Sequence, residues 1–360
     1  WGSVGGVKCM VLFAMPVFLG NLFQQLYNTA DALIVGNLVG RNALAAVTST
    51  GSIVYLAVGT FTGFSMGAGI VIARYIGAED SEKTSQTVHT AVAMGLFFSV
   101  LFTALGVLFS PVILRAMGTP EDVFTDAALY LKIYFAGCTG LVMYNIFVGI
   151  LQASGDSTHP LYYLITSSVI NVVLDILFVG PLGMGPLGAA LATVIGQAVS
   201  FLFALRLLYR KREEIYFDFK PRHFRIGKQV IRPLISLGIP MVIQSAAVTF
   251  SMLFVNAYVN TYGTTAVAVT GVARKLEGMI GVVSQAISSA GGAMIAQALG
   301  AGKIKRVPKV VYTALWVVAI PASVFALITW FRPEWLFGIF TQDPAVLQTV
   351  LNEYITVAMI

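Results

Sequence analysis

Long apolar segments separated by short polar loops dominate this chain, and they limit it to a small set of folds. In lipid every backbone polar group has to be satisfied internally, and a helix of about 20 apolar residues spans the hydrocarbon. Alternating ten-residue segments, which are typical of membrane barrels, are absent. We therefore predict an all-α integral membrane protein. The expected helices are about 8–36, 43–76, 88–114, 124–150, 160–180, 187–209, 229–260, 266–298, 307–330 and one beginning near 345.

Composition and charge support a membrane protein with a defined orientation. Only 11% of the residues are charged, whereas a soluble domain has about 25%. Of the 22 lysines and arginines, 16 lie at the N-terminus or in loops after even-numbered helices. The positive-inside rule then places the N-terminus in the cytoplasm. This bias explains the net positive charge better than a nucleic-acid partner does.

The chain repeats itself at an offset of 223 residues. Asn37-Leu-Val-Gly-Arg-Asn-Ala-Leu-Ala matches Asn260-Thr-Tyr-Gly-Thr-Thr-Ala-Val-Ala, and Gly69–Ala78 matches Gly292–Ala301. Six helices separate the copies, so both halves enter the membrane in the same direction, as in many secondary transporters. We expect an N-terminal lobe over 1–210, a basic cytoplasmic linker over 211–228 and a C-terminal lobe over 229–360.

A polar stripe ending in an acid marks the first expected helix. Asn21, Gln24, Asn28 and Asp31 follow at spacings of three, four and three, which places them on one helical face. A carboxylate inside hydrocarbon costs roughly 2.5–3.5 kcal/mol on insertion scales, so such residues mark ion or substrate pathways. The counterpart of Asp31 in the second half, near Phe254, is apolar. We therefore expect ion handling in the first half.

A second acid is expected at the depth of Asp31. Asn171 and Asp175 share a face of the 160–180 helix, and Thr193 of the 187–209 helix falls at the same depth. Two carboxylates close together in a low dielectric do not both ionise readily, so the pair is suited to carrying a proton. The alternative is that these groups only hydrogen-bond neighbouring helices.

Other polar or helix-breaking residues permit more than one interpretation. Pro16 breaks the ladder of the first helix and forms either a static kink or a hinge. Glu277 is expected to pair with Arg274, one turn earlier. Asp156 is interpreted as a helix cap in a tight loop. The histidines and the two cysteines lack metal spacing.

With these residues in hand, the whole chain resembles the multidrug and toxic compound extrusion (MATE) family, in its DinF-like branch. The motifs are Pro16 with Tyr27-Asn-Thr-Ala-Asp31, Leu151-Gln-Ala-Ser-Gly-Asp156, Asn171-Val-Val-Leu-Asp175 and Thr193. The family fold implies twelve helices in two six-helix lobes. About ten are present here, and because the last expected helix reaches Ile360 without a polar end, we expect a truncated C-terminus.

The resemblance implies a role for each matching residue. Asp31, Asp175, Asn171 and Thr193 match the family's proton or cation site, and Pro16 matches its bending proline. The family's substrate cavity falls on Tyr27, Tyr130 and Asn145, beside Gln24 and Asn28 of the polar stripe. Sodium-coupled relatives carry an acid on the seventh helix, whereas 229–260 has none.

The sequence thus predicts a proton-driven antiporter that exports organic, often cationic compounds across a bacterial or archaeal inner membrane. It is not expected to be an enzyme, because no nucleotide motif, metal motif or nucleophile elbow is visible. We expect no cofactor beyond the coupling ion, H⁺ or Na⁺, and a monomer in the lipid bilayer. Alternatives are sodium-coupled efflux, with Na⁺ at Asp31 and Asp175, and a lipid-linked precursor flippase. The flippase would favour embedded bases, which are few here.

Overall fold

The computed structural model describes residues 6–220, 224, 227–262, 264–338, 347–348 and 350, and these contain helices but no strand. The first half comprises α1 (Gly6–Leu38), α2 (Arg41–Gly77), α3 (Ser81–Ala116), α4 (Glu121–Ala136), α5 (Cys138–Ala153), α6 (Thr158–Val179) and α7 (Gly185–Arg210). The second half comprises α8 (Lys228–Asn260), α9 (Thr264–Gly300), the short 3-10 helix η2 (Ile304–Arg306), α10 (Val307–Phe331) and α11 (Pro333–Phe337). Most of the helix expected from 345 lies outside the described residues.

The helices of the described residues are long and apolar enough to make this a multi-pass membrane protein. Eight of them could each cross a membrane, and α4 with α5 could form a ninth, bent span. Large apolar side chains face outward, including Phe97 on α3, which is 65% exposed, and Phe331 on α10, which is 71% exposed. This outward apolar surface is what a lipid solvent requires. The prediction of an all-α membrane protein is confirmed.

The helix predicted over 124–150 is broken, which corrects the sequence interpretation. α4 ends at Ala136, α5 begins at Cys138, and their axes differ by 47°. Gly137 lies at the break, where a Cβ atom would overlap the side chain of Val194 on α7. The missing side chain lets α7 approach the backbone at this point. Propensity and periodicity do not reveal such a contact between distant segments.

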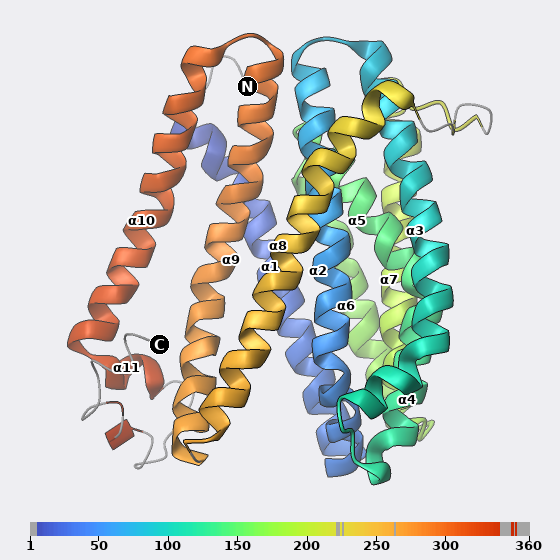
Figure 1. Cartoon of the computed structure of the whole chain (residues 1–360), viewed down its shortest axis with the longest axis vertical. Helices are drawn as coiled ribbons and strands as arrows, with labels where there is room; N and C mark the ends of the chain where they lie inside the picture. Colours follow the sequence, from blue (N-terminus) through green and yellow to red (C-terminus); the bar gives the residue numbers. More distant parts are fainter. Residues whose placement is uncertain are drawn as a thin grey trace.

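The first two helices of each half pack against helices of the other half. α1 and α8 each contain 33 residues, and α2 and α9 each contain 37. α2 packs along α8, and α1 packs along α9 (Figure 1). Met10, Phe13 and Ala14 of α1 are buried in one apolar cluster with Ile287 and Ala290 of α9. This arrangement is consistent with a parallel repeat about a two-fold-like axis.

One end of the bundle carries most of the basic loops, and we call it the basic end. It holds the α2–α3 turn (78–80), which is flanked by Arg74 and Lys83, residues 211–220 and 227 of the segment that joins α7 to α8, and the α9–α10 turn (301–306). Figure 1 shows the α2–α3 and α9–α10 turns at this same end. Exposed lysines and arginines at this end include Arg210, the last residue of α7, and Lys220, Lys303 and Lys305 on the loops.

The segment that joins the halves packs against the first half. Ile215 and Phe217 are buried in the same apolar cluster as residues of α2, α3, α5 and α7. Asp218 Oδ1 lies 3.0 Å from Nε2 of the buried His89 on α3. The backbone N–H of Gly227 donates to Thr90 Oγ1 at 3.1 Å. Ile215, Phe217 and Asp218, and also Gly227 just before α8, are therefore held against the first half.

Candidate functional site

Two buried carboxyl groups meet between α1 and α6. Asp31 on α1 is 8% exposed, and Asp175 on α6 is 0% exposed. Their side chains lie within hydrogen-bonding reach of each other. The contact exists because α1 packs along α6 over much of its length. The structure thus brings together the two acids that the sequence placed at one depth.

Asn171 and Thr193 complete the polar contact between α6 and α7. Oriented with its nitrogen toward Asp175, the Asn171 amide donates to Oδ2 at 3.3 Å and accepts from the backbone N–H of Thr193 at 3.1 Å. Thr193 Oγ1 donates to the carbonyl of Ala189 at 3.0 Å, one turn earlier on α7. Asn171 is thereby held at both ends of its amide, with one end on the acid.

Two tyrosines lie close to the acids. Tyr27, one turn before Asp31 on α1, is within electrostatic reach of Asp31, and its hydroxyl contacts the side chain of Gln24. Tyr130 on α4 is buried, packs in a cluster with Val35 and Val179, and also lies within electrostatic reach of Asp31. The acids are therefore bordered by phenol groups as well as by amides.

The site contains oxygens that accept no hydrogen bond from the described part of the protein. These are Oδ1 of Asp31, Oδ1 of Asp175 and Oε1 of Gln197. Each unsatisfied buried oxygen costs about 1–3 kcal/mol, and more when it carries charge. A proton on one carboxyl group supplies a donor for the other, and a cation supplies a positive charge for both. The arrangement is thus suited to exchanging one small cation.

Several predicted residues lie apart from this cluster. Asn145 is in a contact between α2 and α5: it accepts from Thr62 Oγ1 at 3.2 Å and donates to the Leu141 carbonyl at 2.8 Å. Asn28 is exposed on α1, and Pro16 lies inside α1, which continues past it. Their roles in the substrate cavity and as a hinge stay predictions.

The expected Arg274–Glu277 ion pair is wrong for the described residues. Arg274 Nη2 instead donates to the backbone carbonyl of Met252 on α8 at 3.5 Å, and Glu277 is exposed. Arg274 thus bonds to the backbone of α8 and not to Glu277, the partner one helical turn away that the sequence pattern suggested.

Gln197 and Tyr134 belong to the site but were not selected from the sequence. Gln197 lies one turn after Thr193 on α7, and its side chain contacts the hydroxyl of the buried Tyr134 on α4. The signal for Gln197 was its spacing of four residues from Thr193. Tyr134 has the same spacing from Tyr130, but it also resembles an ordinary core aromatic residue.

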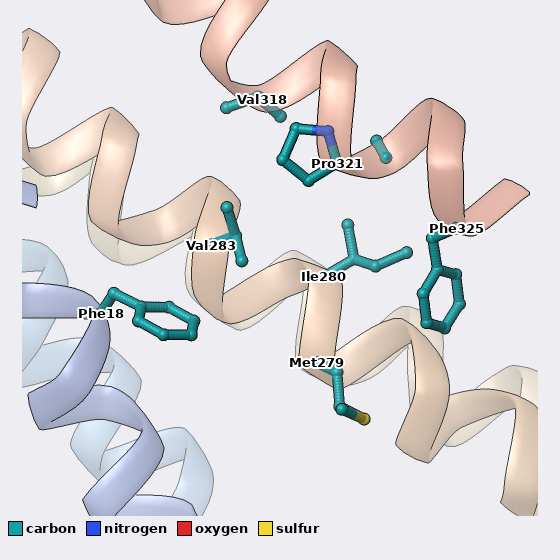
Figure 2. A pocket seen from close by; sticks show the side chains of 8 residues that line it. Phe18, Met279, Ile280, Val283, Val318, Pro321 and Phe325 are labelled. Carbon is teal, nitrogen blue, oxygen red and sulfur yellow. The ribbon is translucent and has the colours of Figure 1, made fainter. Parts of the chain in front are cut away.

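An apolar cavity of about 220 Å³ lies elsewhere, where α1, α9 and α10 meet. Figure 2 shows Phe18 of α1 facing Val283 and Ile280 of α9, with Pro321 and Phe325 of α10 on the other side. None of the predicted site residues lines it. The carboxyl cluster and this cavity are therefore separate features.

The sequence profile of the MatE family matches residues 16–177 and 240–360. The probable multidrug resistance protein YpnP of Bacillus subtilis (strain 168) is 30% identical over 94% of this chain and 75% of its own length. The probable multidrug resistance protein YoeA of the same organism is 29% identical, over 94% and 74%.

Solved structures agree closely with the fold. A multidrug resistance MATE family transporter of the MOP superfamily, in an outward-facing conformation, has a TM-score of 0.88 and 27% identity, covering 99% of this chain and 78% of that one. A MOP superfamily transporter from Pyrococcus furiosus, described as having a binding pocket of reverse polarity that suggests a different function, has a TM-score of 0.86 and 27% identity. The match covers 97% of this chain and 77% of that one.

Proposed function

Because this chain belongs to the MATE family of multidrug efflux transporters, we propose that it is a secondary antiporter that exchanges protons for organic, often cationic compounds. The single observation that carries the choice of ion is the contact between Asp31 and Asp175. These acids face each other in a buried site, and an oxygen of each accepts no hydrogen bond from the described residues. A shared proton satisfies such a pair directly.

The proposed cycle couples this proton to movement of the two halves. A proton that enters from outside neutralises the pair and weakens the attraction of the first half for a cationic substrate. α1 carries Asp31 and packs on both α6 and α9, so a change at the pair reaches both halves. The halves then rock, and the proton leaves on the inner side. Pro16 would act as the hinge in α1.

The orientation belongs to the same proposal. The basic end faces the cytoplasm, because lysines and arginines are retained on that side of membranes. The hydrogen bonds that join the two halves through α9 include two at this end, at Gln152 and Ala153. With that end closed, the conformation corresponds to the outward-facing state.

Replacement of Asp31 tests the proposal. In vesicles with an imposed pH gradient, Asp31→Asn should lower efflux of a fluorescent organic cation such as ethidium at least about tenfold, because the asparagine cannot ionise. Asp122→Asn, an exposed acid on α4, is the matched control and should transport normally. Full transport by correctly folded Asp31→Asn would contradict the proposal.

Sodium is the second candidate ion, because the carboxylate, amide and hydroxyl oxygens around Asp175 also suit a hard cation. Ethidium should release protons from the purified protein in sodium-free buffer. The same release should be lost in Asp31→Asn. If a sodium gradient drives efflux without any pH gradient, and no proton is released, sodium replaces the proton in this scheme.

A further inference from the structure

The ends of α2 and α9 cross at the basic end with their backbones in contact. A Cβ atom on Gly77 of α2 would overlap the backbone of Gln297 on α9, and one on Gly300 of α9 would overlap the carbonyl of Arg74 on α2. Each glycine thus packs on the residue that lies three positions before the other glycine. Only glycine permits this approach of two helices.

The crossing is reciprocal. Gly77 and Gly300 are 223 residues apart, and so are Arg74 and Gln297, which is the offset of the internal repeat. The same contact is therefore made twice, once in each direction, as in a two-fold interface between identical surfaces. The two contacts differ at the residue on which each glycine packs: it is Arg74 in the first half and Gln297 in the second.

Side chains of α9 fasten the crossing to the first half. Gln297 Nε2 donates to the carbonyl of Ala153 at the end of α5, at 2.8 Å. Two turns earlier, Ser289 Oγ donates to Gln152 Oε1 at 3.1 Å. One further turn back, Asn21 Nδ2 of α1 donates to Gln285 Oε1 at 3.4 Å. These three residues of α9 follow at intervals of four and eight, so they form one stripe toward the first half.

We propose that this crossing is the latch that keeps the basic end shut, and that its strength sets how often the transporter opens to that side. The latch comprises Gly77, Gly300 and the bonds from Ser289 and Gln297. The inference rests on the proposed alternation between two conformations. It assigns the inner gate to α9 and to the end of α5, away from the acids.

A distance measurement tests the latch without transport. Spin labels are placed at Ser81→Cys and Lys305→Cys, two exposed positions at the basic end on opposite halves, after Cys9 and Cys138 are replaced by alanine. The full chain is studied in lipid nanodiscs without substrate or gradient. The closed latch should give mainly a short distance.

Weakening the latch should raise the population with a longer distance. Gly300→Ala adds a methyl group that overlaps Arg74 only when the latch is closed, and should raise that population at least about fivefold. Gln297→Leu removes one bond between helices and should raise it about threefold. Two matched controls lie on α9: Gly281→Ala enters open space, and Ser288→Ala changes an exposed hydroxyl. Both controls should match the parent.

Wild-type distances in Gly300→Ala and Gln297→Leu would overturn the inference. A second experiment needs neither variant. Gln152→Cys and Ser289→Cys are joined with a short reducible thiol crosslinker, which should lower efflux at least about tenfold until the reagent is reduced. Full-rate efflux by the crosslinked protein would also overturn it. Loss of proton coupling in Asp31→Asn is a separate result, because the label distances do not depend on which ion drives transport.

Discussion

Two acids with the same side chain have opposite surroundings in this protein. Asp175 faces another acid, whereas Asp156, between α5 and α6, faces a lysine and a histidine. Asp156 Oδ2 lies 2.7 Å from both Lys211 Nζ and His159 Nδ1, and Oδ1 accepts from the His159 backbone N–H at 3.1 Å. Burial raises the pKa of the Asp156 carboxyl group. The Lys211 and His159 hydrogen bonds outweigh burial and hold this pKa below its ordinary value.

Asp156→Asn should therefore destabilise the protein by about 1–2 kcal/mol at pH 7, because it removes an ion pair and weakens a helix cap. A group whose pKa falls on folding contributes stability above its unfolded pKa, about 3.9, and loses it as the pH falls through the folded value. The difference in melting temperature between variant and parent should thus be fully present at pH 5 and shrink below about pH 4.

The control for this prediction is Asp126→Asn, an exposed acid on α4, which should melt like the parent at each pH. A gap between Asp156→Asn and the parent that widens as the pH falls below 5 would contradict the assignment of a lowered pKa.

The residues of the site were partly predictable for a physical reason. Helical spacing and depth in the membrane locate Asp31, Asp175, Asn171 and Thr193, because acids inside apolar segments are costly and hence conspicuous. Asn145 was also expected in the cavity; it lies in a contact of α2 with α5, and its role in the cavity stays a prediction. An amide costs less to bury, so its presence alone does not distinguish a binding group from a contact between helices.

At the scale of single elements, polar ends and breaks were harder to predict than apolar centres. The predicted helix 43–76 agrees with α2, but α3 begins at Ser81 rather than 88. Its polar first turns are stabilised by Asp80, whose side chain accepts from the Lys83 backbone N–H at 2.9 Å. At the break between α4 and α5, Gly137 lies against Val194, a residue of α7 far along the sequence.

The break at Gly137 yields a prediction about α4, α5 and α7. Gly137→Ala should destabilise the protein by about 1–3 kcal/mol, because its methyl group overlaps Val194. The backbone of Gly137 lies at φ −93°, which alanine also adopts, so the cost arises from the neighbour. In the double variant with Val194→Ala, most of this loss should be recovered. Thermal unfolding of the two single variants and the double variant measures the coupling, and additive losses would refute it.

At the scale of the whole molecule, the repeat indicated two equivalent halves but did not indicate which helices join them. The pairing of α2 with α8 and of α1 with α9 depends on close contacts, such as Gly67 against the backbone of Gly238. Sequence spacing within one helix carries no information about which other helix supplies such a backbone. Loop charge, in contrast, bears on orientation directly.

The orientation can be tested on the whole molecule. Single cysteines at Ser81 and Lys305 lie at the basic end, and one at the exposed Thr125 lies on α4, near the opposite end. With a thiol reagent that does not cross membranes, Thr125→Cys should react in intact cells. Ser81→Cys and Lys305→Cys should react only in inside-out vesicles. The reverse pattern would place the basic end outside.

The fixed segment between the halves has a mechanical consequence. Residues 211–220 are held against the first half by the buried side chains of Ile215 and Phe217 and by the His89–Asp218 contact. This part of the connection is therefore packed and is not a loose linker. Load that turns one half against the other can then pass along α8 as well as through the contacts of α1 and α2 with α9. Pro233 and Pro240 lie inside α8, and each removes one hydrogen bond from the helical ladder. We therefore expect α8 to bend or twist more easily at its two prolines than elsewhere along its length.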